Sequence, residues 1–193
     1  HIRISCLGIN YLAHFIEDFE FTFKRKVRIL EFGDGISTIW WARNFPENEI
    51  YSIGGDKWWF DWVEELLVKE KPHHTKHLFH KATNYYTTEK DDSLDYAHCI
   101  DELNPPFDVI INDGAQREIV GDYILSNADK YIPKGGIYLR HDYEMAILGN
   151  WVGFRDNLPE WCRDEKDLGY EGFCHTHPEY SLVATTGNGL AGY

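Results

Sequence analysis

The sequence lacks a long hydrophobic run and is poor in cysteine. A membrane-spanning helix needs about 18 consecutive apolar residues, and no stretch of the 193 residues approaches that length. The four cysteines, Cys6, Cys99, Cys162 and Cys174, are widely scattered and form no C-x-x-C pair. This spacing matches neither a zinc site nor a dense disulfide framework. We therefore expect no membrane partner, free thiols in a reducing compartment, and a cytoplasmic protein.

Positive charge is also scarce, because 19 Lys and Arg face 32 Asp and Glu, for a net charge of −13. Nucleic-acid binding requires clustered basic side chains that neutralise phosphates. The only basic run, residues 24–26, lies just before the first expected strand, and we interpret it as a solvated lead-in. We expect no nucleic-acid partner, and a small molecule or a protein as the substrate instead.

The composition is that of one globular domain over residues 1–193, with 43% hydrophobic and 16% aromatic residues. Periodicity and helix breakers predict alternating helices and strands. Short apolar strands flanked by helices form parallel sheets covered on both faces, and ligands bind beyond the carboxyl ends of such strands. The expected helices span residues 10–24, 37–44, 58–71, 94–103 and 119–130, and the expected strands span 27–32, 49–53, 75–80, 107–111, 136–139, 172–175 and 181–185.

The most informative stretch is residues 27–38, with the sequence VRILEFGDGIST. An apolar strand leads into Glu31, and Gly33 and Gly35 then form a turn that opens a helix. Glycine has no Cβ, so such a turn brings backbone N–H groups close to a ligand. The dinucleotide-binding fingerprint needs a third glycine three residues later, and Thr38 stands there instead.

The Glu-x-Gly-x-Gly pattern resembles motif I of the class I S-adenosylmethionine-dependent methyltransferases. The resemblance continues in the apolar strand that ends at Asp113-Gly114 and in the strand introduced by Gly135-Gly136, and it covers residues 27–142. It implies a single-domain Rossmann-like α/β fold, with a mostly parallel seven-stranded sheet and helices on both faces. Residues 1–26 would be a helical lead-in, and residues 151–193 would supply the closing strands and a substrate lid.

The resemblance implies S-adenosylmethionine as the cofactor. Gly33 and Gly35 would admit its methionine moiety, and Glu31 would hold its ammonium group directly or through water. Ser37, a candidate helix cap, belongs to the same cofactor site, and Asp113 would lie beside the sulfonium and the acceptor. The simpler alternatives are that the glycines serve only a tight turn, that Glu31 caps the helix or pairs with a lysine, and that Asp113 starts a turn.

The sequence departs from the family where the ribose would bind. The family ends its second strand with an acid that grips both ribose hydroxyls, and Gly54 stands at that position here. Losing a charge-assisted contact costs on the order of 1.5–3 kcal/mol, or roughly 10–100-fold in affinity. Asp56 is the candidate substitute, and it is an equally good cap for the next helix. Asn84 is the candidate adenine contact, with the alternative of an ordinary polar loop, and Trp58 and Trp59 would either wall the adenine or pack in the core.

Catalysis would consist mostly of positioning, with a base that removes a proton from the acceptor. His141 and Asp113 are the candidate bases, and Arg117 and Asp142 are the candidate substrate contacts; a surface ion pair is the alternative for Arg117. Asp113 and Asp142 also raise the hypothesis of a divalent-metal site, but we predict no metal. The histidines at 73, 74, 77 and 80 run into a strand, which breaks the helical register that a metal site would need.

We therefore predict methyl transfer from S-adenosylmethionine to an oxygen or nitrogen of a small-molecule acceptor. The alternative is a degenerate methyltransferase fold that binds a ligand or a protein without catalysis, as Gly54 suggests. An NAD-dependent oxidoreductase is disfavoured by the missing third glycine and by Gly54. The sequence names neither the acceptor nor the oligomeric state, and a homo-oligomer stays open.

Overall fold

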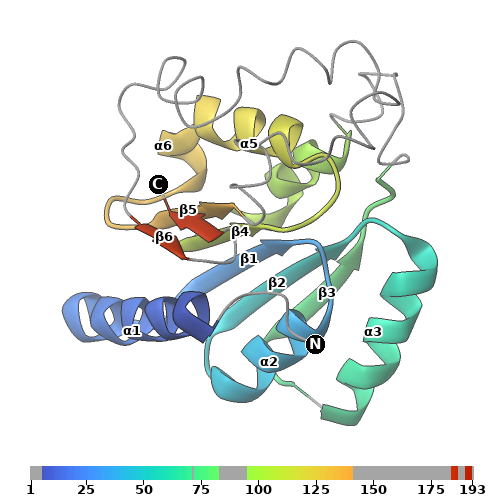
Figure 1. Cartoon of the computed structure of the whole chain (residues 1–193), viewed down its shortest axis with the longest axis horizontal. Helices are drawn as coiled ribbons and strands as arrows, with labels where there is room; N and C mark the ends of the chain where they lie inside the picture. The colour runs from blue at the N-terminus through green and yellow to red at the C-terminus, as the bar shows by residue number, and fades with distance from the viewer. Residues whose placement is uncertain (1–5, 71, 83–94, 141–183, 187–189, 193) are drawn as a thin grey trace.

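The computed structural model describes residues 6–70, 72–82, 95–140, 184–186 and 190–192. Its centre is a parallel sheet with the strand order β3-β2-β1-β4-β5 (Figure 1). Two three-residue strands follow β5 in the sheet, with β7 antiparallel to β5 and β6 antiparallel to β7. The strands are β1 (Arg28–Phe32), β2 (Glu49–Gly54), β3 (Thr75–Phe79), β4 (Val109–Asn112), β5 (Ile137–Arg140), β6 (Ala184–Thr186) and β7 (Leu190–Gly192).

Helices cover both faces of this sheet (Figure 1). One face carries α1 (Cys6–Phe23), α2 (Ile36–Asn44) and α3 (Lys57–Glu70), and the other carries the 3₁₀ helix η1 (Cys99–Leu103), α5 (Arg117–Ser126) and α6 (Ala128–Tyr131). The α/β class and the parallel sheet are confirmed. The single helix expected over 119–130 is two helices that meet at Asn127. The strand expected at 172–175 lies outside the described residues, and so do the residues of the expected lid up to 183.

The start of α2 corrects one prediction. Ser37 was the expected cap, but the helix begins at Ile36, and Gly35 is its N-cap residue. The backbone N–H of Gly35 donates to Thr38 Oγ1 at 3.0 Å, which fixes the first turn from inside the helix. Ser37 is therefore the second residue of the helix, two positions after the residue that caps it.

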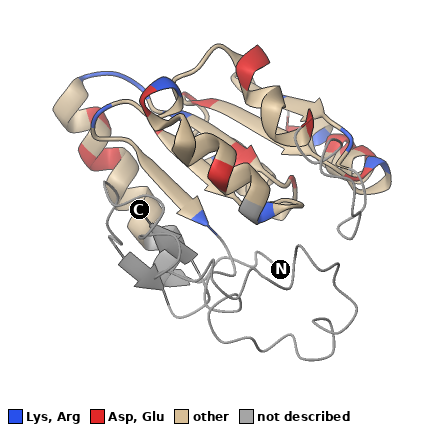
Figure 2. Cartoon of the chain, turned by 90° about the horizontal axis from the view of Figure 1, so that it is seen from above, with Lys and Arg blue, Asp and Glu red and all other residues tan. Residues whose placement is uncertain are grey.

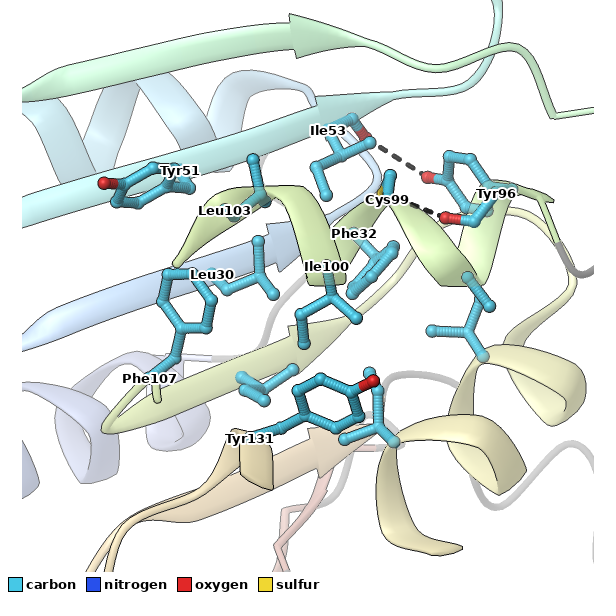
Figure 3. Packing of buried hydrophobic residues seen from close by; sticks show 14 of the residues in the cluster. Leu30, Phe32, Tyr51, Ile53, Tyr96, Cys99, Ile100, Leu103, Phe107 and Tyr131 are labelled. Atoms are coloured by element: carbon cyan, nitrogen blue, oxygen red, sulfur yellow. Dashed lines mark hydrogen bonds between the residues drawn. The ribbon is translucent and has the colours of Figure 1, made fainter. Parts of the chain in front are cut away.

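The core divides between the two faces because successive strand residues point in opposite directions. On β1, Leu30 and Phe32 pack against η1, α5 and α6, whereas Ile29 packs against α1 and α2. Figure 3 shows the first of these clusters, in which the Tyr96 hydroxyl donates to the carbonyl of Ile53 at 3.2 Å. Cys99, in the same cluster, is a free buried thiol, and burial raises its pKa to about 12.

The basic run at 24–26 is tied to acids of the same chain. Arg25 donates to both carboxylate oxygens of buried Asp108 at 2.6 Å, and Lys26 donates to Glu20 at 2.8 Å. Figure 2 shows Asp and Glu interspersed with Lys and Arg over the described helices. No described helix is long and apolar enough to cross a membrane.

Candidate functional site

The loop that joins β1 to α2, residues 33–35, lies at the carboxyl end of the sheet. Gly33 has φ +95°, and a Cβ there would lie 2.6 Å from the backbone of Asp113 and of Gly114. Its N–H donates to the carbonyl of Ile53 at 2.9 Å, so this glycine joins the ends of β1, β2 and β4. Glycine is therefore required at position 33 by the protein's own packing.

Gly35 has no such internal requirement. Its φ of 170° is extended backbone that any residue adopts. Among the described residues, the nearest atom to a Cβ at this position would be Trp59 Nε1 at 3.8 Å, an ordinary contact. A glycine that the fold does not need, in a loop at the carboxyl end of a parallel sheet, leaves space for a ligand.

Glu31 lies behind this loop and is completely buried. Its carboxylate accepts hydrogen bonds from Thr38 Oγ1 at 2.6 Å, Ser52 Oγ at 3.1 Å and Trp41 Nε1 at 3.2 Å. Burial raises the pKa of Glu31 to about 7, although hydrogen bonds from Ser37, Thr38 and Trp41 oppose the rise. Thr38 also accepts the Gly35 N–H, so Glu31 reaches the loop through one hydroxyl.

These contacts bear on the alternative roles that the sequence offered for Glu31. The described partners of Glu31 are the hydroxyls of Ser37, Thr38 and Ser52 and the indole of Trp41, and no lysine is among them, which argues against the pairing with a lysine. In the sequence, Thr38 was noted only as the residue in place of a third glycine, and Ser52 was not noted as a site residue. The signal for Thr38 was its position three residues after the capping glycine, where a side chain reaches back to the helix start. Contact of Glu31 with a cofactor ammonium stays a prediction.

The end of β4 brings two predicted residues together. Arg117 Nη2 donates to Asp113 Oδ1 at 3.0 Å and to the Asp113 carbonyl at 3.3 Å, and both side chains are about one-fifth exposed. The ion pair that the sequence offered as the alternative role of Arg117 is therefore present. Asn112, which the sequence reasoning missed, is buried beside them, and its Nδ2 donates to the Arg117 carbonyl at 2.7 Å and to Tyr138 Oη at 2.6 Å. A polar residue that ends an apolar strand was the available signal.

The end of β2 shows what replaces the expected acid. A Cβ at Gly54 would lie 2.6 Å from Asp34 Oδ2 and 2.8 Å from the Phe60 ring, so the Asp34 carboxylate fills the space that a side chain would use. Asp34 Oδ2 lies 2.9 Å from His77 Nε2, and His77 Nδ1 lies 2.7 Å from Glu64 Oε2. Sequence reasoning treated His77 only as one of a group of histidines and did not find these partners.

Asp56 and the two tryptophans lie at the start of α3. Asp56 Oδ1 accepts the Trp59 N–H at 2.8 Å, so Asp56 caps this helix, and its ribose contact stays a prediction. Trp58 is largely exposed, so its assignment to the core is wrong. Trp59 donates its indole N–H to the carbonyl of Asp34 at 2.8 Å and so lies against the glycine loop.

The remaining predicted site residues, Asn84, His141 and Asp142, lie outside the described residues. Within the described ranges, no group of three or more His, Cys, Asp or Glu is arranged to hold a metal ion. His77 lies in β3, which confirms that this histidine-rich segment runs into a strand.

The chain is similar to known proteins in its three-dimensional structure, and not in its sequence. No family model and no curated protein matches the chain. A putative caffeoyl-CoA O-methyltransferase from Staphylococcus aureus is similar, with a TM-score of 0.62 and 15% identity over 98% of this chain and 83% of that one. A putative O-methyltransferase from Klebsiella pneumoniae is also similar, with a TM-score of 0.59 and 19% identity over 98% of this chain and 78% of that one.

A third similar structure is the O-methyltransferase TomG from Streptomyces achromogenes, solved in complex with S-adenosylmethionine. It gives a TM-score of 0.54 and 22% identity, over 86% of this chain and 70% of that one. Likeness at these identities shows the fold. The chain has the Rossmann-like fold of the class I S-adenosylmethionine-dependent methyltransferases, as the resemblance of its motif implies.

Proposed function

We propose that this protein binds S-adenosylmethionine at the glycine loop and transfers its methyl group to an oxygen or nitrogen of a small molecule. The observation that carries the proposal is the pair of glycines. Gly33 is required by the fold, whereas Gly35 leaves a space that no described side chain fills. The fold supports the same conclusion, because the similar solved structures include two putative O-methyltransferases and the O-methyltransferase TomG, which holds S-adenosylmethionine.

The methionine moiety would lie over Gly33 and Gly35, with Ser37 at the first turn of α2 beside it. The adenosine would extend toward Asp56 and Asn84, and Trp59 would form a wall between the loop and α3. The adenosine contacts are the least supported part of the site, because Asp56 already caps a helix and Gly54 offers no acid. We therefore expect affinity below that of a site with a strand-end carboxylate.

Catalysis would depend on holding the acceptor in line with the sulfonium methyl group. Asp113 follows β4 at the edge that carries the glycine loop, and Arg117 orients its carboxylate through the contact at 3.0 Å. Asp113 or His141 would remove the acceptor proton. Arg117 and Asp142 would contact the acceptor, and an acidic acceptor would compete with Asp113 for the guanidinium.

The test is isothermal titration of the protein with S-adenosylmethionine and S-adenosylhomocysteine, repeated on Gly35→Ala. The variant fits the backbone and adds one methyl group at ordinary contact distance from Trp59, so its thermal melting should match that of the wild type. The added methyl obstructs the ligand, and we expect binding at least about tenfold weaker, equivalent to about 1.4 kcal/mol. Glu65→Gln, a change at an exposed position, is the control for effects of preparing a variant protein.

Equal binding by the wild type and Gly35→Ala would contradict the placement of the ligand over the loop. Absence of binding to the folded wild type would favour a module that binds another ligand or a protein without catalysis. With binding established, transfer of a labelled methyl group to a panel of small phenols, alcohols and amines would identify the acceptor class.

A further inference from the structure

Three side chains tie the glycine loop to two other elements. Asp34 comes from the loop, His77 from β3 and Glu64 from α3. The imidazole lies between the two carboxylates, with Nε2 at 2.9 Å from Asp34 Oδ2 and Nδ1 at 2.7 Å from Glu64 Oε2. The side chains of His77 and Asp34 are only 3% exposed, so this contact is shielded from water.

The geometry determines the protonation of the imidazole. An ionised carboxylate only accepts hydrogen bonds, so a ring nitrogen that faces one must donate. Both nitrogens of His77 face carboxylates, which requires the doubly protonated, positively charged ring. Burial by itself lowers the pKa of His77, but the hydrogen bonds and negative charges of Asp34 and Glu64 outweigh it, and the pKa is raised above its ordinary value.

Asp34 and Glu64 are the charged groups that raise the pKa of His77, and the nearby Lys57 of α3, whose Nζ lies 5.6 Å from the centroid of the Phe60 ring, is paired with Asp61. Phe60 of α3 stacks on the imidazole, with ring centroids 4.0 Å apart, and Ser52 of β2 is the register partner of His77 in the sheet. The clasp formed by Asp34, His77 and Glu64 therefore consists of one cation between two anions, and only Glu64 is half-exposed.

The clasp acts on the residue between the two glycines. Asp34 lies between Gly33 and Gly35, so its side chain fixes the centre of the loop. Its carboxylate lies against Gly54, the position where the resemblance places a ribose-binding acid. Its carbonyl accepts the Trp59 indole N–H from the other side.

We propose that His77 is a positioning residue that fixes the glycine loop for cofactor binding by holding Asp34 with a protonated imidazole, with Glu64 as the second anion. This inference rests on the proposed function. Position 54 is a glycine because the Asp34 carboxylate occupies the space of its side chain. Loss of the proton leaves one ring nitrogen facing a carboxylate without a hydrogen, and the loop is released.

Two variants test the clasp against a matched control. His77→Gln removes the cation, and His74→Gln makes the same change at an exposed histidine three residues away. Glu64→Gln is the milder variant, because it keeps the contact between Asp34 and His77 and removes one negative charge. Dissociation constants for S-adenosylhomocysteine would be measured from pH 6 to pH 9.

We expect His77→Gln to bind at least about tenfold more weakly than the wild type at pH 6.5. Wild-type affinity should fall as the pH rises through the pKa of His77, toward that of the variant, which should itself lack this dependence. Glu64→Gln should shift the fall to lower pH, and His74→Gln should superimpose on the wild type. Unchanged affinity and pH profile in both His77→Gln and Glu64→Gln would overturn the proposal.

A second readout needs no cofactor. Nitrogen chemical shifts of the imidazole at pH 6 should show both ring nitrogens protonated, and amide exchange at residues 33–35 should be faster in His77→Gln than in the wild type. A neutral imidazole, or equal exchange, would overturn the clasp even if the cofactor binds. Loop protection that depends on His77 in a protein that binds no cofactor would support the clasp and contradict only the proposed function.

Discussion

Replacing Glu31 with Gln tests whether the fold contains a buried carboxyl group that resists ionisation. Glu31 is completely buried, and its folded-state pKa rises from 4.5 to about 7. The folded state therefore binds more protons than the unfolded chain between those two pH values. Stability must then fall as the pH rises through that range. Gln has almost the same shape and does not titrate, so the free energy of unfolding of the variant does not decrease for this reason.

The structure gives the size of the effect. A rise in pKa from 4.5 to about 7, at about 1.36 kcal/mol per pH unit, corresponds to about 3 kcal/mol over the whole range. About 2.5 kcal/mol of this falls between pH 5 and pH 8. The comparison of two pH values cancels any fixed cost of placing an amide against Thr38, Ser52 and Trp41. It also cancels the titration of His77, which both proteins share.

The assay is urea unfolding of the wild type and Glu31→Gln at pH 5 and at pH 8, with Glu65→Gln as the exposed control. The stability of Glu31→Gln relative to the wild type should increase by about 2.5 kcal/mol from pH 5 to pH 8, and that of the control should stay constant. A constant difference between Glu31→Gln and the wild type at the two pH values would refute the reasoning. It would mean that Glu31 ionises in the folded state as easily as in the unfolded chain.

Three further predictions concern single residues. Gly33→Ala should lower the free energy of unfolding by about 2 kcal/mol or more, because φ is +95° and the new Cβ would lie 2.6 Å from the backbone of Asp113; a melting curve measures this. Arg25→Met should lower the free energy of unfolding by about 1–3 kcal/mol, because the buried Asp108 carboxylate loses its cation. A destabilisation that becomes smaller above about 0.5 M salt would point instead to a surface ion pair. Cys99, with a pKa of about 12, should resist alkylation at pH 8 until urea unfolds the chain, as peptide mass mapping would show.

Local patterns predicted much of the fold. The apolar run before Glu31, the glycine turn and the strand that ends at Asp113 each depend on neighbours in sequence, and the structure places all three at the expected edge. Pro72 after the helix and Gly135-Gly136 before β5 likewise mark boundaries that the structure has within a residue or two. These signals work because hydrogen bonding and side-chain periodicity are short-range.

The candidate site was harder to predict because its contacts join distant residues. Asp34 and His77 are 43 positions apart, and no local pattern indicates that a loop carboxylate takes the place of a side chain at Gly54. Asp56 was ambiguous for a different reason, since an aspartate before a helix suits both a cap and a ligand. Only the contact with the Trp59 amide shows the cap.

Gly33 and Gly114 lie back to back where β1 and β4 end. A Cβ on Gly33 would collide with Gly114, and a Cβ on Gly114 would lie 2.9 Å from the Gly33 nitrogen and 2.7 Å from the Tyr96 hydroxyl. The two backbone segments are thus in direct contact, and a side chain at either position would collide with the other segment. The route by which this chain could evolve a different specificity is therefore narrow. Single substitutions at Gly33 or Gly114 require the backbone to shift, so a change in acceptor specificity must arise at positions outside this glycine contact.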